Sequence, residues 1–108
     1  MGINNTQTAY SFGQLGSLYL ADTNEATPPA GKVFVAITIL EDAKFQGLTA
    51  DNDTAGSGLE YIGTSASYSS NGGDAIPNTV SFQAGLTVYG RWTSVNLADG
   101  KVIAYIGD

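Results

Sequence analysis

The sequence predicts an all-β fold, namely a small antiparallel β-sandwich, a jelly roll or a β-barrel. Three observations lead to this prediction. The apolar runs are short and rich in β-branched residues, and clusters of Gly, Ser, Asn, Asp and Pro separate them. No longer stretch repeats its apolar side chains at the 3.6-residue period of a helix. Several short strands divided by turn residues are typical of sandwiches and barrels.

The chain of 108 residues has the length of one domain. Residues 1–16 begin with small polar side chains, so we expect an N-terminal arm or a loosely held first strand there. Residues 17–108 are predicted to form a single β domain. Within it, residues 22–31 form a loop, because Pro28 and Pro29 followed by Gly31 suit neither a helix nor a central strand.

Residues 32–40 are the clearest predicted strand. Strict alternation would place Val33, Val35, Ile37 and Ile39 on one face and Phe34, Ala36 and Leu40 on the other. A strand with one exposed face should alternate with polar residues, and this one does not. We therefore expect both faces to be buried, and a neighbouring subunit could cover the second.

Further strands are expected at residues 43–50, 59–64 and 79–83, with a turn-rich loop at residues 51–58. Residues 65–78 are expected to form a long loop or the tip of a hairpin with a type I′ turn at Asn71 and Gly72. Residues 86–107 are predicted to form a β-hairpin. Its turn would be Ala98, Asp99 and Gly100, with the glycine in the left-handed position. The parity of the apolar residues changes near Gly90, which indicates a β-bulge there.

The composition excludes several classes of function. The net charge is -6, and only four side chains are basic, so nucleic-acid binding is not expected. The chain contains no Cys and no His, which removes zinc-thiolate sites and the commonest general base. No apolar run is long enough for a membrane span. We therefore expect a protein that is not an enzyme and that uses no cofactor and no metal.

Two acidic patterns are candidate sites. Asp51, Asp53 and Gly56 match positions 1, 3 and 6 of a calcium-binding EF-hand loop, but the ligands at positions 5 and 12 are missing. A surface turn is the favoured interpretation. Carboxylate pairs for glycoside cleavage could come from the adjacent Glu41 and Asp42 or from Glu60 and Asp99. The first pair would point to opposite faces of an extended chain, and nothing in the sequence brings the second pair together.

Aromatic residues offer a binding surface of a different kind. An aromatic platform for sugar could combine Tyr61, Tyr68, Tyr89, Trp92 and Tyr105. The favoured alternative is that Tyr89 and Trp92 fill the core or a subunit interface. Arg91 is the only arginine, and it is expected to make a structural contact with a carboxylate or an aromatic ring.

The segment FQAGLTVYGRWTSVNLADGKVIAYIG, residues 82–107, resembles a recurring ending of small structural proteins of marine tailed bacteriophages. Residues 33–42, VFVAITILED, share this resemblance. The two matches cover about a third of the chain and contain no catalytic motif. The resemblance implies a component of the virion without specifying which one.

These observations lead to the expectation of a bacteriophage capsid decoration protein on the virion surface. A strand that is apolar on both faces favours a homo-oligomer. The resemblance implies, by analogy with decoration proteins, a trimer that binds the lattice of the major capsid protein. The residues expected to form interface or structural contacts are Phe34, Val35, Ile37, Ile39, Tyr89, Arg91, Trp92 and Tyr105. The alternatives are a tail, fibre or adhesin component and a carbohydrate-binding β-sandwich module.

Overall fold

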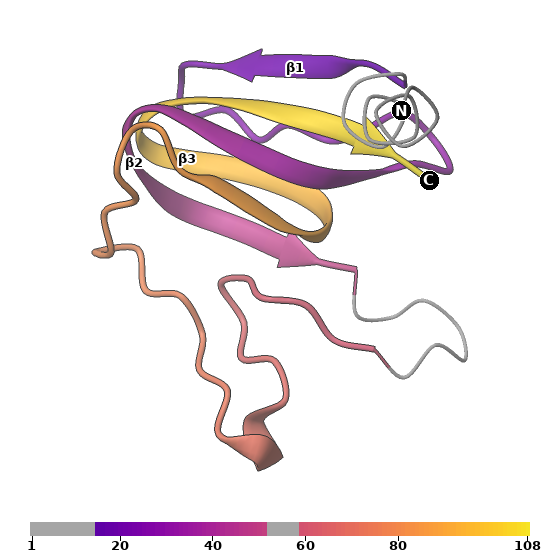
Figure 1. Cartoon of the computed structure of the whole chain (residues 1–108), viewed down its shortest axis with the longest axis vertical. Helices are drawn as coiled ribbons and strands as arrows, with labels where there is room; N and C mark the ends of the chain where they lie inside the picture. Colours follow the sequence, from indigo (N-terminus) through magenta and orange to yellow (C-terminus); the bar gives the residue numbers. More distant parts are fainter. Residues whose placement is uncertain (1–14, 52–58) are drawn as a thin grey trace, which may run out of the picture.

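The computed structural model describes residues 15–51 and 59–108. Within these ranges the regular elements are the strands β1 (Ser17–Leu20), β2 (Val33–Ala50) and β3 (Thr87–Gly107), with one short 3-10 turn at Ser69–Asn71. The strands form one antiparallel sheet in the order β1-β3-β2 (Figure 1). The all-β prediction is therefore confirmed. No helix in the described part of the chain has the length and apolar character needed to cross a membrane.

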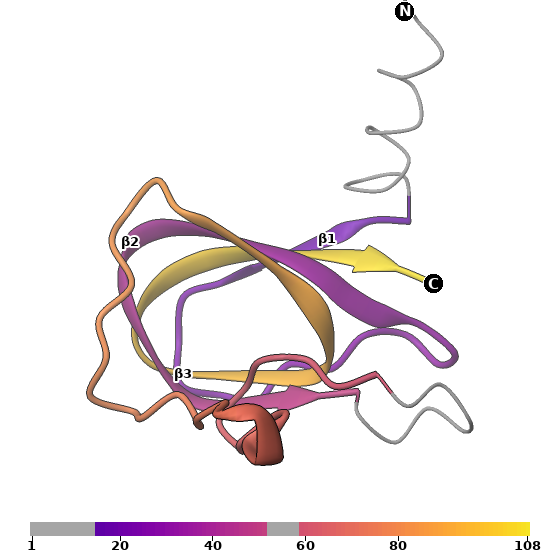
Figure 2. The same cartoon turned by 60° about the horizontal axis from the view of Figure 1, so that its bottom comes forward.

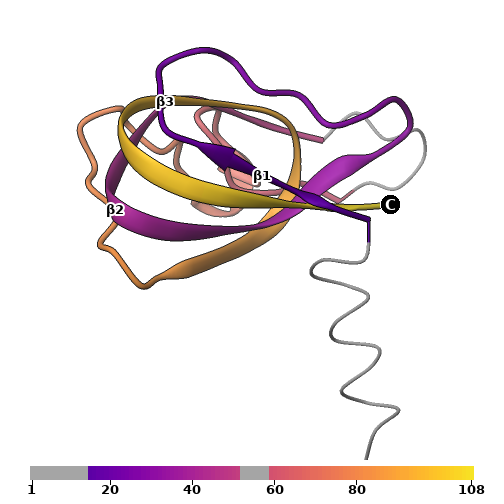
Figure 3. The ribbon, with the colours of Figure 1, turned by 90° about the horizontal axis from the view of Figure 1, so that it is seen from above.

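The two long strands curl around one another. Ile37 in the first half of β2 lies opposite Val88 near the start of β3 and also opposite Ala104 near its end. β3 therefore passes along both edges of this part of β2, as the turned views show (Figures 2 and 3). β1 pairs with the last part of β3, where Leu18 lies opposite Ala104. Most of the predicted arm, residues 1–14, lies outside the described residues.

The predicted hairpin at residues 86–107 is wrong, because β3 runs through residues 98–100 as one continuous strand. Both of its arms hydrogen-bond to β2 instead of to each other. β2 bends at the same place, where Glu41 lies opposite Lys101 and Lys44 lies opposite Asp99. Gly100 does adopt the predicted left-handed conformation, with φ +93°. The turn residues thus bend the strand, because β2 supplies a continuous partner on both sides of the bend.

Two predicted strands merge and two others are not regular strands. The predicted strands 32–40, from Val33 onward, and 43–50 belong to the single strand β2, whereas residues 59–64 and 79–83 are irregular. Each irregular segment is hydrogen-bonded to β2 near one residue. Thr64 N donates to Leu48 O at 2.9 Å, and Phe82 forms an isolated bridge with Ala43. The predicted loop at residues 65–78 is confirmed apart from its single 3-10 turn.

One core fills the curled sheet. Its largest fully buried side chains are Trp92, Phe34, Phe45, Ile37, Ile39, Leu48, Leu97, Val95 and Val102. Phe82 from the irregular segment packs edge-on against Phe45, with ring centroids 5.2 Å apart and an interplanar angle of 76°. The segment before β2 contributes Ala26, which bridges to Val95. The long loops therefore close the core that the sheet alone leaves open.

The expected burial of both faces of residues 32–40 has an explanation within one chain. Phe34 lies opposite Ile106 and Ile37 lies opposite Ala104, so three steps along β2 match two steps along β3. This register shift inserts one extra residue and reverses the parity of the strand. Phe34 and Ile37 consequently both enter the same core, and each is 0% exposed.

A second register shift confirms the β-bulge predicted near Gly90. Phe34 lies opposite Trp92 and Ala36 lies opposite Tyr89, so β3 carries the extra residue here. A Cβ atom on Gly90 would lie 2.7 Å from Cζ2 of the Trp92 ring. Glycine is therefore required because the buried ring packs directly against the backbone of the bulge.

We expect Gly90→Ala to lower the free energy of unfolding by about 1–3 kcal/mol, since the indole ring must shift within a packed core. Urea unfolding measures the change. Gly47→Ala is the matched control, because the new Cβ would meet Asn96 at an ordinary 3.6 Å. Equal stability of the two variants would contradict the close approach of Trp92 to Gly90.

Candidate functional site

The outer face of the sheet carries a shallow pocket between two tyrosines. Ala36 on β2 lies opposite Tyr89 on one side and opposite Tyr105 on the other. Neighbouring strands are about 4.8 Å apart, so the two strands that carry the tyrosines are separated by about 10 Å. The pocket between them has a volume of about 190 Å³, and Thr38 and Thr87 complete its lining. We call this pocket the tyrosine slot.

The register establishes that the slot faces away from the core. Tyr105 lies between Ala104 and Ile106, which both belong to the core, so its side chain points to the opposite face of the sheet. Directly opposite residues on neighbouring strands share a face, which places Ala36 and Tyr89 on the outer side as well. Tyr89 is 61% exposed, whereas Ala36 is 1% exposed and forms the floor.

A pair of hydroxyl groups completes the slot. Thr38 and Thr87 are cross-strand partners, and their Oγ1 atoms are 3.0 Å apart, which is hydrogen-bonding distance. The five residues that line the slot carry no carboxylate, amine or guanidinium group. The slot therefore combines two aromatic side chains, a small apolar floor and an uncharged polar pair.

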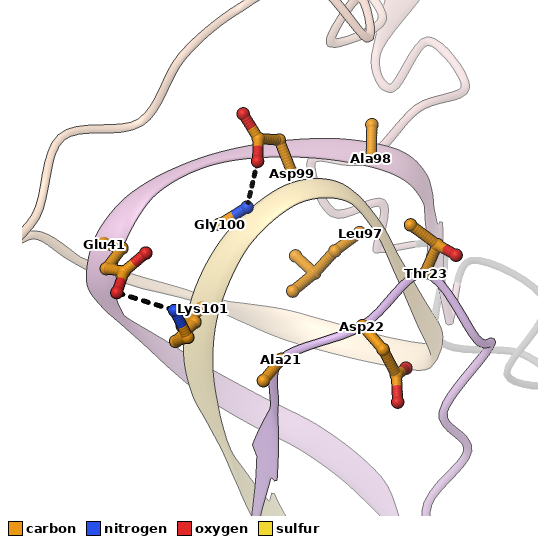
Figure 4. Close-up of a pocket in the computed structure, with 9 residues that line it drawn as sticks. All are labelled: Ala21, Asp22, Thr23, Glu41, Leu97, Ala98, Asp99, Gly100 and Lys101. Carbon is orange, nitrogen blue, oxygen red and sulfur yellow. Dashed lines mark hydrogen bonds and ion pairs between the residues drawn. The ribbon is translucent and has the colours of Figure 1, made fainter.

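A second pocket, of about 200 Å³, lies where β2 and β3 bend (Figure 4). Lys101 Nζ lies 2.7 Å from Glu41 Oε2, and Asp99 Oδ1 accepts the backbone N–H of Gly100 at 2.9 Å. Asp22, which also lines the pocket, accepts the N–H of Asn24 with its Oδ1 at 3.0 Å. Glu41 thus links β2 to β3 at the bend, whereas Asp99 and Asp22 each bind a backbone N–H of their own segment. They stand on separate sides of the pocket in Figure 4.

The contact with Glu41 also shifts the pKa of Lys101. The hydrogen bond to Glu41, and then the negative charge of that carboxylate, raise the pKa of the Lys101 amine above its ordinary value. A raised pKa in the folded state means that the pair stabilises the fold throughout the neutral range. This contribution is lost only as the pH rises through the raised pKa. Both side chains are well exposed, so the contribution is small.

The acidic candidates do not assemble into a catalytic or metal site in the described residues. In residues 15–51 and 59–108, no group of three or more His, Cys, Asp or Glu side chains could hold a metal ion. Of the calcium candidates, Asp51 faces Arg91, with 3.4 Å between Asp51 Oδ2 and Arg91 Nη2. Asp53 and Gly56 lie outside the described residues. In the first carboxylate pair, Glu41 contacts Lys101 and Asp42 accepts the backbone N–H of Ala84 at 2.9 Å.

The remaining pair, Glu60 and Asp99, is engaged in two separate places. Glu60 Oε1 accepts the N–H of Tyr68 at 2.6 Å, and the Tyr68 hydroxyl accepts the N–H of Glu60 at 3.2 Å. Asp99 is bound to the bend, as described above. Glu60 therefore fixes the loop around the 3-10 turn, where Tyr68 itself has φ +48°.

The predicted aromatic platform is divided by the fold. Trp92 is 0% exposed, and its indole N–H donates to the carbonyl oxygen of Ile62 at 2.7 Å, so it belongs to the core. Tyr68 is held by Glu60 in the long loop. Tyr61 is half-buried in the irregular segment 59–64. Of the five aromatic residues, Tyr89 and Tyr105 line the slot. Tyr89 is 61% exposed, so the expectation that it could fill the core is wrong.

The other predicted contact residues are placed as follows. Ile39 joins Phe34 and Ile37 in the core, and Val35 is half-buried. Arg91 makes a structural contact, since its Nη1 donates to the carbonyl oxygen of Asp108 at 2.8 Å while Nη2 faces Asp51. Arg91 thus links the C-terminal residue to the end of β2.

Three residues of the slot were not identified from the sequence. Ala36 and Thr38 look like ordinary strand residues, and Thr87 lies far away along the chain. Only the pairing of both ends of β3 with β2 brings them beside the tyrosines. No protein-family model matches the chain. The comparisons with curated proteins and with solved structures likewise found no match.

Proposed function

We propose that this chain is a non-enzymatic structural protein of a bacteriophage virion, namely a decoration protein that binds the surface of the assembled capsid. In this proposal it acts as a homotrimer and clamps neighbouring copies of the major capsid protein. We further propose that its curled sheet is best classed as a small β-barrel, because both edges of the first half of β2 are paired with β3.

The observation that carries the proposal is where the phage-like segments lie in the fold. Residues 33–42 form the first half of β2, and residues 82–107 contain the whole of β3. These two segments pair with each other and supply most of the buried core. The resemblance to phage virion proteins therefore concerns the framework of the domain and not a short surface motif.

Exposed apolar side chains beside this framework support a role in binding other proteins. Leu40 is 43% exposed and Leu86 is 50% exposed. They lie on neighbouring segments, because the carbonyl oxygen of Leu86 accepts the N–H of Ile39 at 2.8 Å. Apolar surface of this kind becomes stabilising when a partner covers it. A ligand that binds only the assembled shell stabilises that shell by mass action.

The copy number of the chain in purified virions tests the proposal. Quantitative mass spectrometry should find the chain in amounts comparable with the major capsid protein, because a decoration protein occupies a repeating lattice. Particles without the chain should also release their genome at a lower temperature than complete particles. A handful of copies per particle would instead indicate a tail or neck component and would overturn the assignment to the capsid.

A further inference from the structure

We propose that the tyrosine slot binds the ring of a neutral sugar. The proposal goes beyond a role on the capsid and does not depend on it, because it rests on the shape and chemistry of one pocket. Small-molecule sites are concave, largely apolar and supplied with a few well-placed polar groups. The slot is a smaller and shallower site, in which the apolar surface of Ala36 and of the two tyrosine rings stands beside the hydroxyl groups of Thr38 and Thr87.

The spacing of the slot suits a single ring. The strands of Tyr89 and Tyr105 are about 10 Å apart across Ala36. A ring between two aromatic side chains needs about 3.5–4.0 Å of carbon-to-carbon distance on each side. The methyl group of Ala36 is small enough to leave this space open, whereas a larger side chain on the floor would fill it.

The polar groups of the slot suit the hydroxyl edge of a sugar. A threonine hydroxyl offers one donor and two acceptor lone pairs. The contact between Thr38 and Thr87 uses one donor and one lone pair, so the two hydroxyls together retain one donor and three lone pairs. A pyranose has apolar C–H faces for the tyrosine rings and hydroxyl groups at its edge for the threonines.

Charge favours a neutral ligand over an anionic one. The lining carries no cationic group that could neutralise a carboxylate or a phosphate. The chain as a whole has a net charge of -6, which repels anions. Arg91, two residues after Tyr89, is the cationic side chain nearest to the slot along β3, and it is already engaged by the carbonyl oxygen of Asp108 and the carboxylate of Asp51.

Two-dimensional amide NMR titrations of the purified chain test the proposal. The probes are the methyl glycosides of glucose, galactose and mannose, with glucuronic acid as the anionic comparison. At least one neutral glycoside should shift the amide signals around Ala36, Thr87 and Tyr89. We expect a Kd on the order of 1 mM, because a single ring has few atoms with which to bind. Tighter binding of the corresponding oligosaccharide would identify a polysaccharide as the source of the ring.

Three variants separate slot binding from general effects. Tyr89→Ala should weaken binding by roughly three- to tenfold through loss of one stacking face. Thr87→Val should weaken it by about two- to tenfold through loss of a hydroxyl. Tyr19→Ala is the matched control, because Tyr19 is also 61% exposed on the outer face but does not line the slot. It should bind like the unmodified chain.

Several results would overturn the proposal. These are the absence of shifts with every neutral glycoside, equal binding of glucuronic acid, and equal weakening by Tyr19→Ala. A proline-rich peptide that shifts the slot signals when no sugar does would instead assign the slot to a protein partner. The copy number in virions is measured separately, so either proposal can fail while the other stands.

Discussion

Replacing Trp92 by alanine is expected to lower the free energy of unfolding by about 3–5 kcal/mol. Trp92 is 0% exposed, and it lies where β3 contacts both Phe34 in the first half of β2 and Ala50 at the end of that strand. Its removal leaves a cavity between these two parts and deprives the Ile62 carbonyl oxygen of its donor. Domains of this size are stable by about 5–15 kcal/mol, so the variant should be partly unfolded at moderate temperature.

Urea unfolding followed by far-ultraviolet circular dichroism measures this loss without depending on tryptophan fluorescence. Trp92→Phe is the first comparison, since it keeps an aromatic ring and should cost about 1–2 kcal/mol, chiefly for the hydrogen bond to Ile62. Tyr89→Ala is the second, because Tyr89 lies on the same strand but is largely exposed. Similar losses for Trp92→Ala and Tyr89→Ala would show that Trp92 does not organise the core.

Replacing Gly100 by alanine is expected to lower the free energy of unfolding by about 3 kcal/mol or more, from two separate causes. The residue has φ +93°, which an L side chain rarely adopts. A Cβ atom would also lie 2.5 Å from the carbonyl oxygen of Asp42 and 2.6 Å from the Cα of Ala43. These are backbone atoms of β2 at the bend, so no side-chain rotation relieves the overlap.

Gly85→Ala separates the two causes. Gly85 has φ +95°, almost the same as Gly100, but nothing lies within 4 Å of the position that its Cβ would occupy. It should therefore show the cost of the backbone conformation alone, about 1–2 kcal/mol. Thermal unfolding of both variants measures the difference. Equal losses would mean that the backbones of β2 and β3 are not in close contact at the bend.

The bulge at Gly90 was predictable because the parity of the apolar residues changes there, and the left-handed conformation of Gly100 because Ala98, Asp99 and Gly100 form a local turn sequence. The predicted hairpin failed because turn residues do not specify which partner the following strand will choose. Ala98, Asp99 and Gly100 suit a hairpin turn, but β2 bends beside them and pairs with both arms of β3. That choice depends on a strand about 60 residues away, which periodicity cannot reveal.

The candidate site was likewise predictable only in part from the sequence. The sequence indicated that Tyr89 and Tyr105 could bind a ligand, but it grouped them with Tyr61, Tyr68 and Trp92. The structure buries Trp92, leaves Tyr61 and Tyr68 in irregular segments, and places Ala36 between Tyr89 and Tyr105. The floor of a pocket made by three strand segments is defined only once their register is known.

The sequence by itself determined that the chain folds as β-structure, because short β-branched runs and Gly-rich turns leave no helical alternative. It also determined the low content of basic side chains and the absence of Cys and His. Only the tertiary structure decided that two strands would curl into one sheet, and that Phe34 and Ile37 would enter the same core. The physical reason is that bulges reverse the parity of a strand, and their positions depend on pairing with distant residues.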